Sequence, residues 1–220
     1  YRRNSSVKYS SMKAFLFLSR GMAAIFDFTV GILVVAVVAH FLSVEPLWWW
    51  YVLGSFLAVL PDMDLMPMIL TGRNVAFNHH ETIMHRPVVI IPIATATAAL
   101  LGGTFFALVA LICVTWHYLH DMREFGGGGI AWAWPYSRLY LSFLGNEQPE
   151  DAKMNFETEN YLEWLNPTPL SVREFILATI LLIVSSQLIF GSIWIGIGVG
   201  ACLWLGAGAV WGAWSLFRSR

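Results

Sequence analysis

Long apolar stretches dominate this chain, and their length is the first guide to its fold. A helix that crosses a bilayer needs roughly 20 apolar residues. Three stretches are of about this length: residues 22–44, 173–190 and 193–217. Three stretches of 13 to 15 residues lie between them, at 47–60, 87–101 and 104–116. Polar turns can extend each shorter helix at one end, so we expect these to cross as well. The pattern predicts an all-α, polytopic membrane helix bundle of about six spans.

The placement of Lys and Arg predicts the orientation, because these residues concentrate in cytoplasmic segments. Five of them precede the first span, and Arg218 and Arg220 follow the last. Three turns between spans carry neither type: 43–46, 102–103 and 191–192. The two longer loops, at 61–86 and 121–173, carry several. We therefore predict that both termini and both longer loops are cytoplasmic.

Composition agrees with a membrane protein. The chain is 57% hydrophobic and 12% charged, whereas soluble domains average roughly 25% charged. The formal net charge of −1 provides no basic field for nucleic acid, so no nucleic-acid partner is expected. Both cysteines lie inside apolar stretches, which indicates buried thiols rather than a disulfide framework. The chain begins at Tyr1 rather than Met, so we expect a segment upstream.

We expect one integral membrane domain over residues 1–220. It comprises a core at 46–140, an acidic cytoplasmic loop at 146–170 and a C-terminal helical hairpin at 172–217. The last span is rich in glycine, and small residues at such spacing let helices approach closely. This close packing can serve contacts within the chain or contacts with another membrane subunit.

Five of the six histidines fall within residues 79–120, at the ends of apolar stretches. They form two clusters with aspartates, LPDMD…NHHETIMH at 60–85 and WHYLHDM at 116–122. Polar and ionisable groups near a bilayer usually mark a functional site. The predicted orientation places both clusters on the cytoplasmic side. His and Asp at these spacings indicate a metal ion held at the membrane surface.

The segment WHYLHDM is the clearest of these motifs. On a helix, His117, His120 and Asp121 stand at i, i+3 and i+4, so they lie on one face about one turn apart. Imidazole nitrogen together with carboxylate oxygen suits Zn, Mn or Fe(II). The alternative is a pair of interfacial histidines beside an aspartate at a helix end.

The motif LPDMD has two carboxylates two residues apart. On a regular α-helix Asp62 and Asp64 would diverge by roughly 200°. They converge only if the chain turns there, and Pro61 and Pro67 favour a turn. Helix-end capping by acidic residues is the alternative.

In NHHETIMHR, a regular helix would not align His80 with His85, whereas it would align Glu81 with His85. Asn78 and Glu81 match a capping box, which predicts a helix that starts at His79. Such a helix N-terminus favours an anion. Three arginines are candidate hydrogen-bond donors to a phosphate: Arg73, Arg86 and Arg123. The alternative is that they are interfacial residues that follow the positive-inside rule.

Taken together, these motifs resemble the bacterial inner-membrane metal-dependent hydrolases of the LexA-regulated type. That family has L-P-D-x-D, then H-R-x-x-T-H-S, then H-x-x-x-D, then a glycine-containing loop that ends in W-P. Here the matching segments are Leu60 to Asp64, His80 to His85, His117 to Asp121, and GGGG at 126–129 followed by Trp134–Pro135. Order and approximate spacing agree over residues 50–140. In the second motif only the histidines match, since Glu81, Met84 and Arg86 replace the family's Arg, Thr and Ser.

The resemblance implies a divalent metal, with Zn favoured over Mn or Fe. Its implied ligands are Asp62, Asp64, His80, His85, His117 and Asp121. The family resembles zinc phospholipases C and single-strand nucleases, which cut phosphodiesters. We therefore expect a membrane-embedded hydrolase of a lipid-like or nucleotide-like phosphoester, with a metal-activated water at the cytoplasmic side of the inner membrane. Glu81 or His120 is the expected proton shuttle, with His79 as the alternative.

Two other functions remain open. The altered second motif and the glycine-rich last span favour a non-catalytic subunit of a larger membrane complex, one that could carry a pigment or another cofactor. A di-iron oxygenase is disfavoured, because desaturase-like sites need about eight histidines and only five are in range here. The lipid bilayer is a partner under every interpretation.

Overall fold

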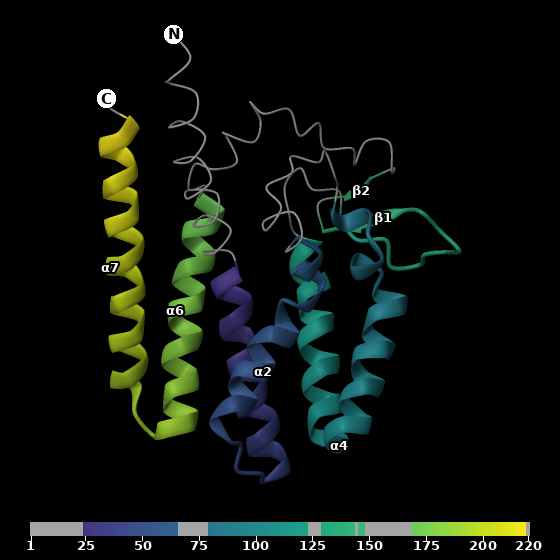
Figure 1. The fold of residues 1–220 in the computed structure, drawn as a ribbon, viewed down its shortest axis with the longest axis horizontal. Helices are drawn as coiled ribbons and strands as arrows, with labels where there is room; N and C mark the ends of the chain where they lie inside the picture. Colours follow the sequence, from purple (N-terminus) through teal and green to yellow (C-terminus); the bar gives the residue numbers. More distant parts are fainter. Residues whose placement is uncertain (1–23, 66–78, 123–128, 144, 148–168, 219–220) are drawn as a thin grey trace, which may run out of the picture. The chain divides into compact units, whose positions relative to one another are not determined.

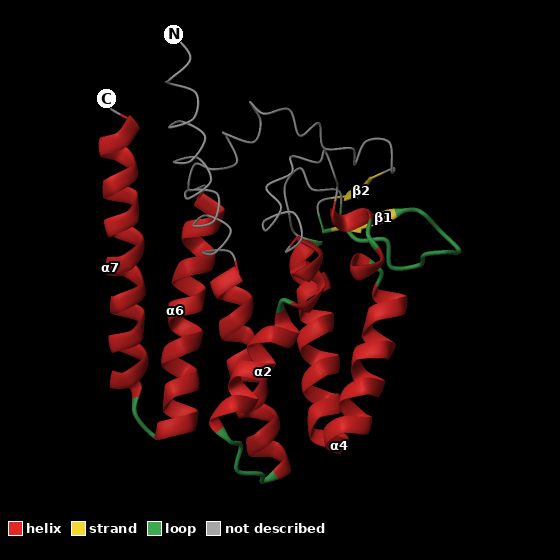
Figure 2. Ribbon diagram, in the orientation of Figure 1, coloured by secondary structure: helices red, strands yellow, loops and turns green. Residues whose placement is uncertain are grey.

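The computed structural model describes residues 24–65, 79–122, 129–143, 145–147 and 169–218. Most of the acidic loop, together with Arg73 and Arg123, lies outside these residues. Four described helices are long and apolar enough to cross a membrane: Ala24–Leu42, Pro87–Asp121, Val172–Phe190 and Ile193–Val210. The chain is thus a largely helical membrane protein, as predicted (Figure 2). The number of crossings and the side of each terminus stay predictions.

The chain divides into two compact units, residues 30–161 and residues 1–29 with 162–220. The first helix, Ala24–Leu42, belongs to the larger unit from Val30 onward and is followed by a turn at Ser43, whose φ is 52°. Helix α2 then runs over Trp48–Ala58, and the 3-10 helix η1 follows at Leu60–Leu65. The first helix, α2 and α4 share one apolar core, formed by Val35, Val38, Ala39, Ala58, Phe105, Val109 and Cys113.

Helix α4, Pro87–Asp121, consists of two arms. Gly103 has φ 75° and ψ −163°, a conformation that glycine adopts readily and other residues rarely do. The chain reverses direction there. The arms lie side by side (Figure 1), and Ile90 on the first packs with Val114 and Tyr118 on the second. Two separate helices were predicted at 87–101 and 104–116, and the break between them falls within the predicted turn.

Two 3-10 turns and one β-hairpin of the larger unit were not predicted. The 3-10 turns η2, His79–Glu81, and η3, Ile83–His85, precede α4. After α4, β1 at Tyr140–Ser142 and β2 at Gly145–Glu147 form an antiparallel hairpin, in which Leu141 pairs with Asn146. An additional bridge joins Ile130 to Leu141, which ties the glycine-containing loop to the hairpin.

The smaller unit contains α6, Pro169–Phe190, and α7, Ile193–Arg218, joined at Gly191 with φ 64°. Gly196 and Gly200 of α7 face α6. A Cβ at Gly196 would lie 2.6 Å from the Cα of Ile183, and one at Gly200 would lie 2.8 Å from Cγ2 of Thr179. This pair therefore serves packing within the chain, whereas Gly198, Gly206, Gly208 and Gly212 have open space beside them among the described residues.

Candidate metal centre

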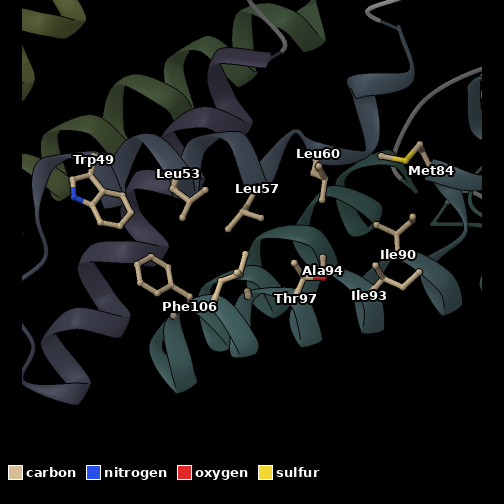
Figure 3. Close-up of a pocket in the computed structure, with 13 residues that line it drawn as sticks. Trp49, Leu53, Leu57, Leu60, Met84, Ile90, Ile93, Ala94, Thr97 and Phe106 are labelled. Carbon is tan, nitrogen blue, oxygen red and sulfur yellow. The ribbon is translucent and has the colours of Figure 1, made fainter.

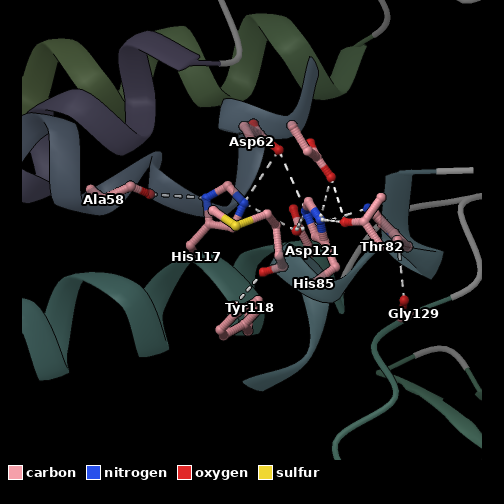
Figure 4. Close-up of polar contacts among 11 residues, drawn as sticks. Ala58, Asp62, Thr82, His85, His117, Tyr118, Asp121 and Gly129 are labelled. Atoms are coloured by element: carbon pink, nitrogen blue, oxygen red, sulfur yellow. Dashed lines mark hydrogen bonds and ion pairs between the residues drawn. The ribbon is translucent and has the colours of Figure 1, made fainter. Parts of the chain in front are cut away.

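Five chemistry-bearing side chains from four separate elements of the larger unit lie close together. Figure 4 labels four of them, Asp62, His85, His117 and Asp121. Helix α4 contributes two of them from its last turn, where His117 and Asp121 stand at i and i+4. The 3-10 segments η1, η2 and η3 contribute one each, namely Asp62, His80 and His85.

Four ligand atoms form a closed ring. Asp62 Oδ1 lies 3.4 Å from His117 Nε2 and 3.5 Å from His85 Nε2. Asp121 Oδ2 lies 3.3 Å from His117 Nε2 and 3.6 Å from His85 Nε2. Ligand atoms about 2.1 Å from a tetrahedral cation lie about 3.4 Å from one another. The four neighbouring distances around the ring match this spacing.

His80 extends this ring on one side. Its Nε2 lies 3.8 Å from Asp121 Oδ2. Among the described residues, two groups have ligand atoms close enough together to hold an ion: Asp62, His85 and His117, and His80, His85 and Asp121. His85 belongs to both groups, and its single Nε2 lone pair binds one ion, so either group can hold an ion through His85 but not both at once.

Each of the three imidazoles is oriented by a hydrogen bond from its second ring nitrogen, Nδ1, to a neighbouring oxygen. His117 Nδ1 donates to the carbonyl of Ala58 over 2.9 Å, and His80 Nδ1 donates to the carbonyl of Gly129 over 3.2 Å. His85 Nδ1 donates to Asp64 Oδ2 over 3.3 Å. A proton on Nδ1 leaves the lone pair of Nε2 toward the ring, and metal-binding histidines are usually oriented by such outer acceptors.

The two carboxylates of the D-x-D motif therefore do not converge on one atom. They lie on opposite nitrogens of His85, with Asp62 at Nε2 and Asp64 at Nδ1. The hydroxyl of Thr82 donates to Asp64 Oδ2 over 2.5 Å and fixes it. The geometry favours Asp64 as a residue that orients His85, rather than as a direct ligand.

Replacing Asp64 with Asn tests this role. The amide keeps the shape but lacks the charge that holds the Nδ1 proton of His85. Loss of such an outer partner typically lowers metal affinity about 10–100-fold. We expect this decrease in a competition titration against a chromophoric chelator, with full stoichiometry restored at saturating metal. A D64N protein that cannot be filled at any metal concentration would identify Asp64 as a direct ligand.

Short 3-10 turns bring the two histidines of the second motif together. The predicted α-helix from His79 is wrong, since η2 ends at Glu81 and Thr82 is extended, with φ −70° and ψ 165°. A continuous α-helix would set His80 and His85 roughly 140° apart. The break lets their rings stack with centroids 5.1 Å apart instead.

Burial and neighbouring charges shift the pKa values of His80 and His85. Burial lowers the pKa of His80, which keeps its ring neutral and able to bind a cation. Burial also opposes the charge on His85, but hydrogen bonds with Asp62 and Asp64 and the charge of Asp121 outweigh it and raise its pKa. The carboxylates thus attract positive charge to the ring, and a metal ion and a proton compete for it.

The loop that follows α4 supports the cluster. Gly129 has φ 55°, and a Cβ there would run into the carbonyl of Leu141, so this position requires glycine. Arg86, next to His85, is buried between Trp134 and Tyr140, each ring centroid 5.7 Å from its guanidinium carbon. Arg86 donates to the carbonyl of Glu81 over 2.9 Å, so it stabilises the segment between Glu81 and His85.

The two candidate proton shuttles lie outside both ion-holding groups. His120 stacks on Trp116, with ring centroids 6.2 Å apart. Glu81 lines a separate cavity of about 290 Å3 with Arg86, Trp134, Arg138 and Tyr140. Their catalytic roles stay predictions.

The helices and the buried His/Asp cluster define a helical membrane protein with a candidate metal centre. The chain belongs to the YdjM inner membrane protein family, whose model matches residues 22–216. No curated protein and no solved structure gave a significant match. The predicted location in an inner membrane is therefore confirmed, whereas the hydrolase activity stays a prediction.

Proposed function

We propose that this protein is a multi-pass, metal-dependent hydrolase of phosphoesters, with its site at the cytoplasmic face of the inner membrane. The closed ring of Asp62, His85, His117 and Asp121 ligand atoms carries the proposal. Imidazole and carboxylate ligands suit Zn first, with Mn and Fe(II) as alternatives. When bound, a divalent cation supplies Lewis-acid polarisation of a phosphoryl oxygen and acidifies a water.

The residues of the chain itself orient and expose the site. Ala58, Asp64 and Gly129 hold the imidazoles so that little rearrangement is needed. Asp62 forms the solvent-accessible side of the site, because its side chain is 34% exposed whereas that of His85 is 0% exposed. Substrate therefore approaches over Asp62. In this proposal Glu81 or His120 moves the proton to or from the reacting group.

A hydrolysis assay on small substrates tests the proposal. Purified protein is stripped of metal, reloaded with Zn or Mn, and assayed on methyl p-nitrophenyl phosphate and p-nitrophenyl phosphate. We expect a metal-dependent rate that Asp121→Asn abolishes. Glu81→Gln and His120→Ala should keep the metal, and the variant that removes the shuttle should lose about 10²–10⁴-fold in rate.

No metal-dependent rate on either ester, in protein that holds stoichiometric metal, would refute the phosphoesterase. Absence of both metal and activity, together with copurification in a stable complex, would instead support the non-catalytic subunit.

A further inference from the structure

An apolar cavity of about 600 Å3 lies between α2 and α4 in the larger unit. Every fourth residue of α2 lines it, starting at Trp49 and continuing through Leu53 and Leu57. Figure 3 shows these side chains pointing across the cavity toward α4. The α4 side chains in the lining are Ile90, Ile93, Ala94, Thr97, Ala98, Leu101 and Phe106.

One end of this cavity is lined by residues that neighbour the candidate metal centre in the sequence. Leu60 and Met84 line that end, two residues before Asp62 and one residue before His85. The Tyr118 hydroxyl donates to the Met84 carbonyl over 2.6 Å, which fixes this wall beside His117. At the other end Trp49 stacks on Phe106, with ring centroids 5.9 Å apart. The cavity therefore runs from two residues that flank the His/Asp cluster in the sequence, Leu60 and Met84, to an aromatic wall of Trp49 and Phe106.

The dimensions match a hydrocarbon chain. Trp49 and Leu57 are eight residues apart on α2, which is about 12 Å along the helix, and Leu60 lies just beyond its end. The hydrocarbon core of a bilayer is about 30 Å thick, so one leaflet is about 15 Å. The volume lies in the range of ligand pockets, roughly 300–1,000 Å3, whereas protein interiors are otherwise closely packed.

The lining excludes a nucleotide. Its side chains provide only the Thr97 hydroxyl and the Trp49 indole nitrogen as polar groups. A base or sugar buried here would lose its hydrogen bonds to water without replacement, which is unfavourable.

We infer that the cavity binds the hydrocarbon tail of an amphiphile whose phosphoester head reaches the His/Asp cluster. The assignment of the head group rests on the proposed function, and that of the tail rests on the cavity alone. The substrate class is then a lipid phosphoester, drawn from the leaflet that faces the cluster. Each CH2 buried contributes up to about a fourfold gain in affinity.

Photolabelling of the purified full-length protein tests the tail site. The probe is a 12-carbon alkyl phosphate with a terminal diazirine, and mass spectrometry maps the adducts. We expect adducts beside Trp49 and Phe106. Ala94→Trp fills the cavity and should reduce them at least tenfold. Ala99→Trp is the matched control, because Ala99 lies on the same arm but is exposed and outside the lining.

A second variant distinguishes a blocked cavity from a misfolded protein. Trp49→Ala removes the aromatic wall, so alkyl phosphate competitors longer than those that saturate the natural protein should continue to gain affinity. Misfolding cannot produce that gain. Adducts spread over exposed positions such as Leu111, unchanged by Ala94→Trp, would overturn the inference.

Hydrolysis of the methyl ester separates the two proposals. Labelling at the aromatic end without any hydrolysis supports the tail site and refutes the proposed phosphoesterase activity. Metal-dependent hydrolysis of methyl p-nitrophenyl phosphate, with labelling insensitive to Ala94→Trp, overturns the tail site and leaves the phosphoesterase intact.

Discussion

Replacing His117 with Ala, or Asp121 with Asn, is expected to abolish stoichiometric metal binding. His117 Nε2 contacts both carboxylates of the ring, at 3.4 and 3.3 Å. Asp121 Oδ2 lies within 3.8 Å of all three imidazoles, so one substitution removes the atom they share. Outer partners alone are worth about 10–100-fold in affinity, so we expect losses beyond 100-fold for direct ligands. Elemental analysis of the purified protein and calorimetric titration with Zn measure them.

The control for this experiment lies on the same helix. His120 is one residue from Asp121 but stacks on Trp116, so His120→Ala should keep the full metal content. Equal metal content in the natural protein and the His117 and Asp121 variants would show that the cluster is a hydrogen-bonded His/Asp network rather than a metal site. Such a result would remove the basis of the proposed hydrolase.

The spacing along α4 was sufficient to place His117 beside Asp121, because both lie on one regular helix at i and i+4. It was not sufficient for His80 and His85. Their approach depends on an extended Thr82 between two 3-10 turns. The capping box predicted a helix that starts at His79, whereas the structure has a 3-10 turn there that ends at Glu81. Local propensity was overridden there by the contacts that the two imidazoles make with carboxylates from other elements.

The partners behind the imidazoles were beyond sequence reasoning for a different reason. Two of them are the backbone carbonyls of Ala58 and Gly129, and every residue has a carbonyl. Only the fold determines which one faces a histidine. The glycine run at 126–129 did mark the loop, and the positive φ of Gly129 now gives one reason for a glycine there.

The glycines are another case in which the role of a residue is determined by the fold and not visible in the sequence. The sequence drew attention to the last span, where Gly196 and Gly200 pack against α6. A close helix contact of the larger unit involves isolated glycines instead. Gly31 on the first helix meets Gly54 on α2, where a Cβ on Gly54 would lie 2.7 Å from the Gly31 carbonyl oxygen. Neither glycine belongs to a motif, so only the packed pair reveals their role.

Substitution of Gly31 by Ala is therefore expected to destabilise the protein and weaken its metal site together. The new Cβ would meet the Gly54 carbonyl carbon at 2.5 Å, and backbone atoms cannot rotate away as a side chain can. Overpacking typically costs about 1–3 kcal/mol. The shift of α2 needed to relieve it also moves Ala58, whose carbonyl orients His117. We expect a lower midpoint of thermal unfolding and about tenfold weaker Zn binding.

Gly198→Ala is the matched control for this prediction. It is also a glycine inside a helix, but a Cβ there meets nothing within 4 Å among the described residues. Alanine in a helix interior is favoured over glycine by about 0.5–1 kcal/mol, so stability should rise or stay unchanged and metal affinity should not move. If Gly31→Ala behaves like Gly198→Ala, the first helix and α2 do not pack at these two glycines. If it lowers stability without weakening Zn binding, the Ala58 carbonyl does not transmit helix packing to the candidate metal centre.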